Sequence, residues 1–315
     1  MFDELKKIIK RINGSENPSA ASKQAPIRSI ASVAAQPSEQ FPKFVTVSRQ
    51  IVAVTNQKGG CAKTTTAINL AACLAEKGYK VLLVDLDPQA HASLGLGIDK
   101  DNIDRTVYDV LINNVELNEI ILRTQVERLD IAPSNSLLSG AQLELASILG
   151  RESVLRIAIR KLLLRKDYDF IFFDCNPSLN LVTINALVAA EAILIPLQTH
   201  YYSLEGMKEL FSTIEIVRER LNPDLHILGI LATLYDTRTK ISAKMLEQIR
   251  DYFKDKVFNT VIRNNVKLCE APIYKKPIHI YDRNCAGTQD YFSLTEEIVA
   301  KTQRCEVRIE SGKIA

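Results

Sequence analysis

The segment Lys58–Thr65, which reads KGGCAKTT, constrains the fold more than any other part of the chain. It follows the short β-branched run Ile51–Val54 and leads into a helical stretch from Lys63 to Glu76, which stops before Gly78. A strand, a glycine-bearing loop and a helix in this order are typical of a phosphate-binding loop in an α/β domain. A plain glycine-rich turn is the alternative interpretation, and the strand and helix on either side argue against it.

The same loop predicts how a polyphosphate is bound. Successive backbone N–H groups and the N-terminus of a helix can surround the phosphates. We expect this role for the whole loop, which consists of Lys58, Gly59, Gly60, Cys61, Ala62, Lys63, Thr64 and Thr65. Lys63 is expected to bridge the β- and γ-phosphates, and the Thr64 hydroxyl to coordinate Mg²⁺. The predicted cofactors are therefore ATP and Mg²⁺.

Short apolar runs alternate with amphipathic stretches over most of the chain. Further strands are predicted at 81–84, 129–132, 170–173, 192–195 and 227–231. Helices are predicted at 153–166, 180–190, 204–221 and 241–253. Buried strands that alternate with helices predict an α/β fold with a mostly parallel sheet and helices on both faces. Functional groups are then expected at the carboxyl ends of the strands.

Acidic residues stand at two of these strand ends. Asp174 follows the apolar strand 170–173, where a buried carboxylate can order Mg²⁺ or its waters. Asp85 and Asp87 follow the strand 81–84, and we expect Asp87 to orient or deprotonate an attacking water. Both positions have a plainer alternative, because strand-end aspartates also cap helices and an aspartate before a proline forms turns.

Several separated motifs resemble the ParA/MinD family of ATPases, which carry a deviant Walker A loop. The resemblance rests on KGGCAKTT at 58–65, DLDPQ at 85–89, FDCNPS at 173–178, YYSLEG at 201–206, CEAP at 269–272 and KPIHIYD at 276–282. It extends over residues 50–302 and points to the ParA/Soj-type partitioning members. It implies an ATPase that forms a dimer around two ATP molecules and positions or segregates a chromosome, a plasmid or a protein assembly.

The resemblance also implies roles for single residues. Lys58 is expected to reach the nucleotide of the opposite subunit, so that hydrolysis depends on the dimer, whereas a solvated loop lysine is the alternative. Asn265 is expected near the adenine. The sequence departs from the family at Ala62, where a glycine is usual, and at Asn176, where a proline is usual. We therefore expect nucleotide binding with slow, partner-stimulated hydrolysis.

Partitioning members bind DNA without sequence preference, through basic residues at positions that resemble Arg238 and Lys267. A few cations on one face are enough for phosphate contacts, so the small net charge of +3 does not argue against them. Ordinary surface charges are the alternative interpretation of both residues. The implied partners are a second copy of the chain, non-specific DNA, and a ParB-like or cargo-adaptor protein that stimulates the ATPase.

The ends of the chain differ from its centre. Residues 1–13 place five apolar side chains at helical spacing opposite a basic face, and residues 14–48 are rich in Ser, Ala, Pro and Gln. We predict an amphipathic helix at 1–13, a flexible linker at 14–48, the ATPase domain at 49–303 and a C-terminal tail at 304–315 without a convincing amphipathic helix. The first helix is expected to dock on a partner or a membrane, or else to fold back onto its own domain.

Composition favours a cytoplasmic protein, and the resemblance implies that it is associated with the nucleoid. Six scattered cysteines without a C-x-x-C pair suit a reducing compartment, and no apolar run reaches the ~18 residues of a membrane span. A MinD-like ATPase that cycles on a membrane is the alternative function, and it depends on residues 1–13 alone. A metabolic or iron–sulfur relative would need a pair of cluster-binding cysteines, which is not evident.

Overall fold

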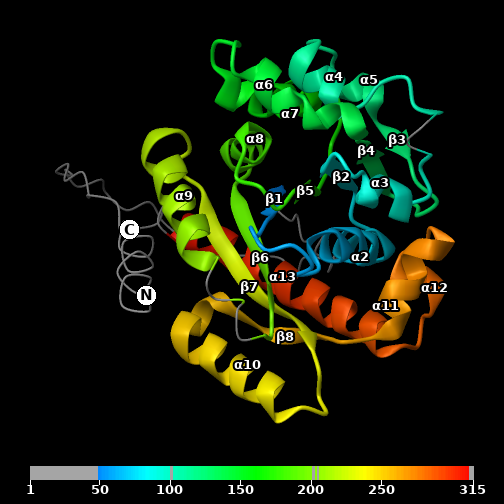
Figure 1. The fold of residues 1–315 in the computed structure, drawn as a ribbon, viewed down its shortest axis with the longest axis vertical. Helices are drawn as coiled ribbons and strands as arrows, with labels where there is room; N and C mark the ends of the chain where they lie inside the picture. Colours follow the sequence, from blue (N-terminus) through cyan, green and yellow to red (C-terminus); the bar gives the residue numbers. More distant parts are fainter. Residues whose placement is uncertain (1–48, 100–101, 201–202, 204–205, 312–315) are drawn as a thin grey trace, which may run out of the picture.

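The computed structural model describes residues 49–99, 102–200, 203 and 206–311, with side chains as far as residue 302. The predicted helix at 1–13 and linker at 14–48 lie outside the described residues. An eight-stranded sheet with the order β3-β4-β2-β5-β1-β6-β7-β8 runs through this part of the chain (Figure 1). All pairings are parallel except β3 with β4. The predicted α/β fold with a mostly parallel sheet is confirmed.

The strands are β1 Gln50–Val54, β2 Val81–Leu86, β3 Leu122–Arg123, β4 Leu129–Ala132, β5 Phe170–Cys175, β6 Ala192–Gln198, β7 His226–Tyr235 and β8 Val257–Arg263. The helices are α2 Lys63–Glu76, α3 His91–Gly95, α4 Val107–Ile112, α5 Leu117–Ile120, α6 Ala141–Leu145, α7 Val154–Leu163, α8 Leu181–Ala189, α9 Met207–Arg220, α10 Lys240–Phe253, α11 Val266–Glu270, α12 Ile278–Tyr281 and α13 Ala286–Ser311.

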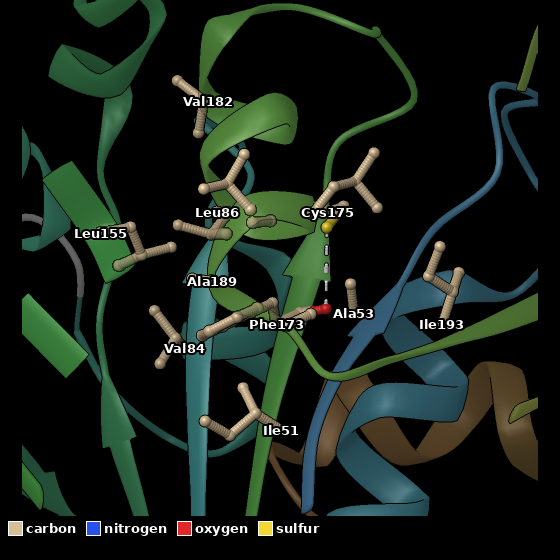
Figure 2. Packing of buried hydrophobic residues seen from close by; sticks show 14 of the residues in the cluster. Ile51, Ala53, Val84, Leu86, Leu155, Phe173, Cys175, Val182, Ala189 and Ile193 are labelled. Atoms are coloured by element: carbon tan, nitrogen blue, oxygen red, sulfur yellow. Dashed lines mark hydrogen bonds between the residues drawn. The ribbon is translucent and has the colours of Figure 1, made fainter. Parts of the chain in front are cut away.

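Both faces of the sheet are buried, because successive side chains of a strand point to opposite faces. In β1, Ile51 and Ala53 belong to one apolar core, whereas Val52 and Val54 belong to the other. The first core lies under α4, α7, α8 and α9, and Figure 2 shows residues of β1, β2 and β5 meeting there. The second core lies under α2 and α13. This double burial explains why the central strands are continuously apolar.

Some elements differ from the sequence predictions. The predicted helix at 153–166 is shorter in the structure, and strand β8 was not predicted. Helix α13 continues to Ser311 and so includes residues 304–311, which we had assigned to a tail. Its first part packs on β8 and α2, and a helix already formed by packing extends at little cost. No helix within the described ranges is long and apolar enough to cross a membrane.

Candidate nucleotide site

The loop Lys58–Thr65 follows the central strand β1 and is anchored by the two strands beyond it. Asn56 donates through Nδ2 to the carbonyl of Pro196 in β6 at 2.7 Å, and its Oδ1 accepts from the backbone N–H of Lys58 at 3.0 Å. Thr233 of β7 donates from Oγ1 to the carbonyl of Cys61 at 3.0 Å. The first and middle parts of the loop are therefore fixed to the sheet, which holds its N–H groups in place for phosphate.

Two residues of the loop adopt a left-handed backbone. Gly60 has φ 69° and Ala62 has φ 68°. Glycine adopts this conformation freely, whereas an alanine pays about 1–2 kcal/mol. The family departure at Ala62 therefore falls on a position whose backbone favours glycine. A Cβ built on Gly59 or Gly60 would meet no atom within 4 Å, so the outer side of the loop is open.

The two lysines of the loop are held inward. Lys63 is 7% exposed, and its Nζ donates to the carbonyl of Lys58 at 3.1 Å and lies 4.0 Å from the sulfur of Cys61. The Nζ of Lys58 donates to the hydroxyl of Ser203 at 3.3 Å. Lys58 is therefore not a fully solvated side chain here. Its predicted contact with a second subunit remains a prediction, as do the roles of Lys63 and Thr64 toward phosphate and metal.

The carboxylate of Asp174 is the most unusual polar group near the loop. Both of its oxygens are buried and lack a hydrogen-bond partner among the described residues. Burial raises the pKa of Asp174 well above its ordinary value, and the adjacent carboxylate of Asp85 raises it further, while Thr64 and Lys63 act in the opposite direction. A buried carboxylate costs free energy unless a cation or a donor compensates it. Asp174 and the neighbouring Thr64 hydroxyl are therefore suited to bind Mg²⁺.

Asp85 is paired with Asp174 across β2 and β5 and is fully buried, but its oxygens are satisfied. It accepts hydrogen bonds from the Ser93 N–H at 2.8 Å, the Ser93 hydroxyl at 2.7 Å and the Asp87 N–H at 3.1 Å. Burial raises the pKa of Asp85 to about 6, although these hydrogen bonds oppose the change. The Ser93 hydroxyl in turn accepts from the N–H of Ser134 at 3.1 Å. Asp85, directly and through Ser93, therefore connects the end of β2, helix α3 and the segment after β4 by hydrogen bonds.

Asp87 is half-buried in the turn that follows β2. Its Oδ1 accepts from the backbone N–H of Gln89 at 2.9 Å, which is the turn-forming contact considered as an alternative in the sequence. The same residue lies at the carboxyl end of the strand next to that of Asp174. Its action on an attacking water is compatible with this position and remains a prediction.

Asn176, which replaces the usual proline, caps the turn between β5 and α8. Its Oδ1 accepts from the Ser178 N–H at 3.1 Å, the Ser178 hydroxyl at 2.9 Å and the Thr183 hydroxyl at 3.1 Å. These bonds fix the turn by side-chain contacts, in place of the restricted φ of a proline. The substitution therefore has a structural explanation.

The remaining predicted residues lie beyond β7 and β8. Asn265 caps α11, where its Oδ1 accepts from the Lys267 N–H at 2.8 Å, so its observed contact is structural and its adenine contact remains a prediction. Arg238 and Lys267 follow the ends of β7 and β8, and each is paired with an acidic residue. Sequence reasoning missed these acidic partners, as it missed the anchors Asn56 and Thr233, because a lone polar residue in a strand or loop carries no distinctive pattern.

Comparison with known proteins agrees with this geometry. A family model described as an AAA domain matches residues 49–227. The chain is 46% identical over 251 residues to the sporulation initiation inhibitor protein Soj of Bacillus subtilis, covering 80% of this chain and 98% of that protein. The chain belongs to the ParA family of partitioning ATPases. It is also 46% identical over 258 residues to the chromosome partitioning protein ParA of Myxococcus xanthus, covering 82% of this chain and 90% of that one.

A solved structure supports the same assignment for the fold and the cofactors. The cobyrinic acid a,c-diamide synthase of Mycobacterium smegmatis, solved with an ATP analog and magnesium, has a TM-score of 0.71 and 36% identity, covering 79% of this chain and 93% of that one. Its nucleotide and metal agree with the ligands expected here from the ParA-family loop. The predictions of a ParA/MinD-type ATPase and of its fold class are confirmed. The partitioning relatives are more similar in sequence, at 46%, than this synthase.

Proposed function

We propose that this protein is an ATPase that binds ATP and Mg²⁺, dimerises in the ATP state and segregates or positions a cargo by binding DNA without sequence preference. The observation that carries the proposal is the buried, unpartnered carboxylate of Asp174 beside a phosphate-binding loop. A bound cation stabilises the charged form of such a carboxylate, and the arrangement occurs in a chain of the partitioning family. Relatives named for chromosome partitioning support the biological role.

The residues divide the chemistry among them. Thr64 and Asp174 would hold Mg²⁺, which screens the phosphate charge when it is bound. Lys63 would leave the carbonyl of Lys58 to contact the β- and γ-phosphates, and the loop N–H groups would surround them. Asp87 would orient the attacking water. Lys58 would supply a cation to the nucleotide of the second subunit, which makes the dimer the active form.

The partners follow from the same scheme. A second copy of the chain closes the two nucleotide sites, DNA is contacted through Arg238 and Lys267, and a ParB-like or cargo-adaptor protein stimulates hydrolysis. The protein is then cytoplasmic and associated with the nucleoid for as long as ATP is bound. Hydrolysis releases it, so the cycle needs a slow intrinsic rate.

Two measurements test the proposal. Light scattering of the Asp87→Ala variant, in which hydrolysis should be blocked, is expected to show a doubling of mass with Mg-ATP and no change with ADP. Lys58→Ala should bind ATP and stay monomeric. Co-sedimentation with DNA and with anionic vesicles, each with ATP and with ADP, is expected to show binding to DNA in ATP only. A monomer under all conditions, or binding to vesicles alone, would contradict the proposal.

A further inference from the structure

Arg238 and Lys267 lie just beyond the carboxyl ends of two neighbouring strands of the sheet. Strands β7 and β8 are parallel neighbours, and the N–H of Asn264, just past β8, donates to the carbonyl of Tyr235 at the end of β7 at 2.9 Å. The two cations therefore follow strand ends that are hydrogen-bonded to each other. They share this region with two carboxylates, which belong to Asp236 and Glu270.

Asp236 holds Arg238 by three hydrogen bonds. The guanidinium donates from Nε to Oδ1 and from Nη2 to Oδ2, both at 2.9 Å, and the Arg238 N–H donates to Oδ1 at 3.0 Å. The guanidinium beside it lowers the pKa of Asp236 to about 2, so the carboxylate is charged at neutral pH. The side chain of Arg238 is 83% exposed, so the pair lies open to solvent and to any ligand.

Glu270 holds Lys267 in a similar way one strand further along. The ammonium lies 3.0 Å from Oε2, and the same oxygen accepts the hydroxyl of Tyr281 at 2.7 Å. The ammonium also lies 5.7 Å from the centre of the Tyr281 ring. Glu270 is thereby positioned by a second contact, which keeps it next to the lysine. Both cations expected to contact DNA thus already have an anion bound.

We propose that Asp236 and Glu270 are internal competitors of the DNA phosphates and set the affinity of this surface. The inference rests on the proposed DNA binding and concerns its regulation. A phosphate that contacts Arg238 or Lys267 competes for the cation with a carboxylate fixed in the same segment. A single protomer then gains little from each contact, and useful affinity requires the two copies of the surface that an ATP-bound dimer presents together.

The test is the double variant Asp236→Asn, Glu270→Gln. Each amide keeps an oxygen in place of the carboxylate, so the Arg238 N–H and the Tyr281 hydroxyl retain an acceptor. An exposed ion pair is worth roughly a factor of 1.4 to five. With four pairs in a dimer, we expect the double variant to bind a random-sequence DNA duplex at least about fourfold more tightly than wild type at low salt.

Salt dependence gives a second readout. When wild type binds, salt cations are released from the DNA, but other salt cations associate with the displaced carboxylates of Asp236 and Glu270, so the net release is smaller. In the double variant this association is absent, so the slope of log affinity against log salt should steepen, by up to about 0.9 for each phosphate contact. We also expect detectable binding with ADP, because one protomer then suffices.

The matched control is the double variant Glu116→Gln, Glu119→Gln. It changes the net charge by the same amount and breaks ion pairs with Arg165 and Arg105, but it lies in and beside α5, at the other end of the sheet (Figure 1). Equal affinity and slope in wild type and in the Asp236→Asn, Glu270→Gln protein, including no binding by either, would overturn the inference, as would an equal gain in the control. If wild type does not bind DNA with ATP, the proposed function is contradicted, and binding by the Asp236→Asn, Glu270→Gln variant alone would still support the inference.

Discussion

Replacing Ala62 by glycine should make the enzyme both slightly more stable and faster. Ala62 has φ 68° and ψ 34° directly before α2, in the small left-handed region. The strain there is about 1–2 kcal/mol. Glycine removes it but gives the unfolded chain more freedom, which costs about 0.4–1 kcal/mol. The net gain is about 0–1.5 kcal/mol, or up to about 6 °C in Tm at roughly 2–4 °C per kcal/mol for a domain of this size.

The effect on turnover has a separate origin. The loop must adjust to the phosphates as the reaction proceeds, and alanine restricts the backbone at the residue before Lys63, whereas glycine has no Cβ to restrict it. If the transition state bears ~1–2 kcal/mol more strain at this residue than the ground state does, its removal raises the rate by about 5–30-fold. We expect a rise of severalfold within this range, measured as steady-state phosphate release together with the affinity for a fluorescent ATP analog.

Ala90 provides the stability control. It also has a left-handed backbone, with φ 55°, and caps α3 outside the phosphate-binding loop. Ala90→Gly relieves the same kind of strain but also removes a fully buried methyl group, so its Tm should rise less than that of Ala62→Gly. Equal turnover in wild type and Ala62→Gly, with the Tm shift present, would show that the methyl group is accommodated during catalysis and would refute the kinetic argument.

Three further predictions concern the buried polar groups. Asp174→Asn should raise Tm without metal, because a desolvated charge is removed, and should abolish the gain in ATP affinity on adding Mg²⁺; an unchanged metal effect would contradict the ligand role. Ser93→Ala should cost about 1–3 kcal/mol of unfolding free energy in urea, because Asp85 loses the hydroxyl donor and the buried Ser134 N–H loses its acceptor, and an unaltered midpoint would show that this link is dispensable. Burial lowers the pKa of His279, so the unfolded chain binds more protons below about pH 6.5 and stability should fall on acidification. This fall should be smaller in His279→Gln, and parallel pH profiles of Tm would exclude it as the source.

The sequence predicted the elements whose pattern is local. The central strands are continuous apolar runs, and the phosphate-binding loop is a glycine-bearing turn between a strand and a helix. Few other structures accommodate either pattern. Strand β8, VFNTVIR, was missed because polar residues interrupt it, and it is an edge strand. Only its pairing with β7 and the cover of α13 make it a strand. Such tertiary support leaves no periodic signal in the chain itself.

Side-chain partners were the least predictable part of the site. The pattern DLD gave Asp85 and Asp87, and the strand 170–173 gave Asp174. Only the structure separates Asp85, which accepts two hydrogen bonds from Ser93, from Asp174, whose oxygens are buried without a hydrogen-bond partner among the described residues. The difference depends on where α3 places Ser93, eight residues after Asp85. Likewise the basic residues Arg238 and Lys267 were visible as charges, whereas their acidic partners were visible only in three dimensions.

The order of the strands relates the nucleotide site to the proposed DNA surface. The loop, Asp87 and Asp174 belong to the adjacent strands β1, β2 and β5, whereas Arg238 follows β7, which is separated from β1 by β6. One contact spans this separation, because Thr233 of β7 donates to the Cys61 carbonyl within the loop. Two residues after Thr233 the strand ends, and the segment that carries Arg238 begins. A shift of the loop on nucleotide binding therefore has a direct route along β7 to the segment that holds Arg238.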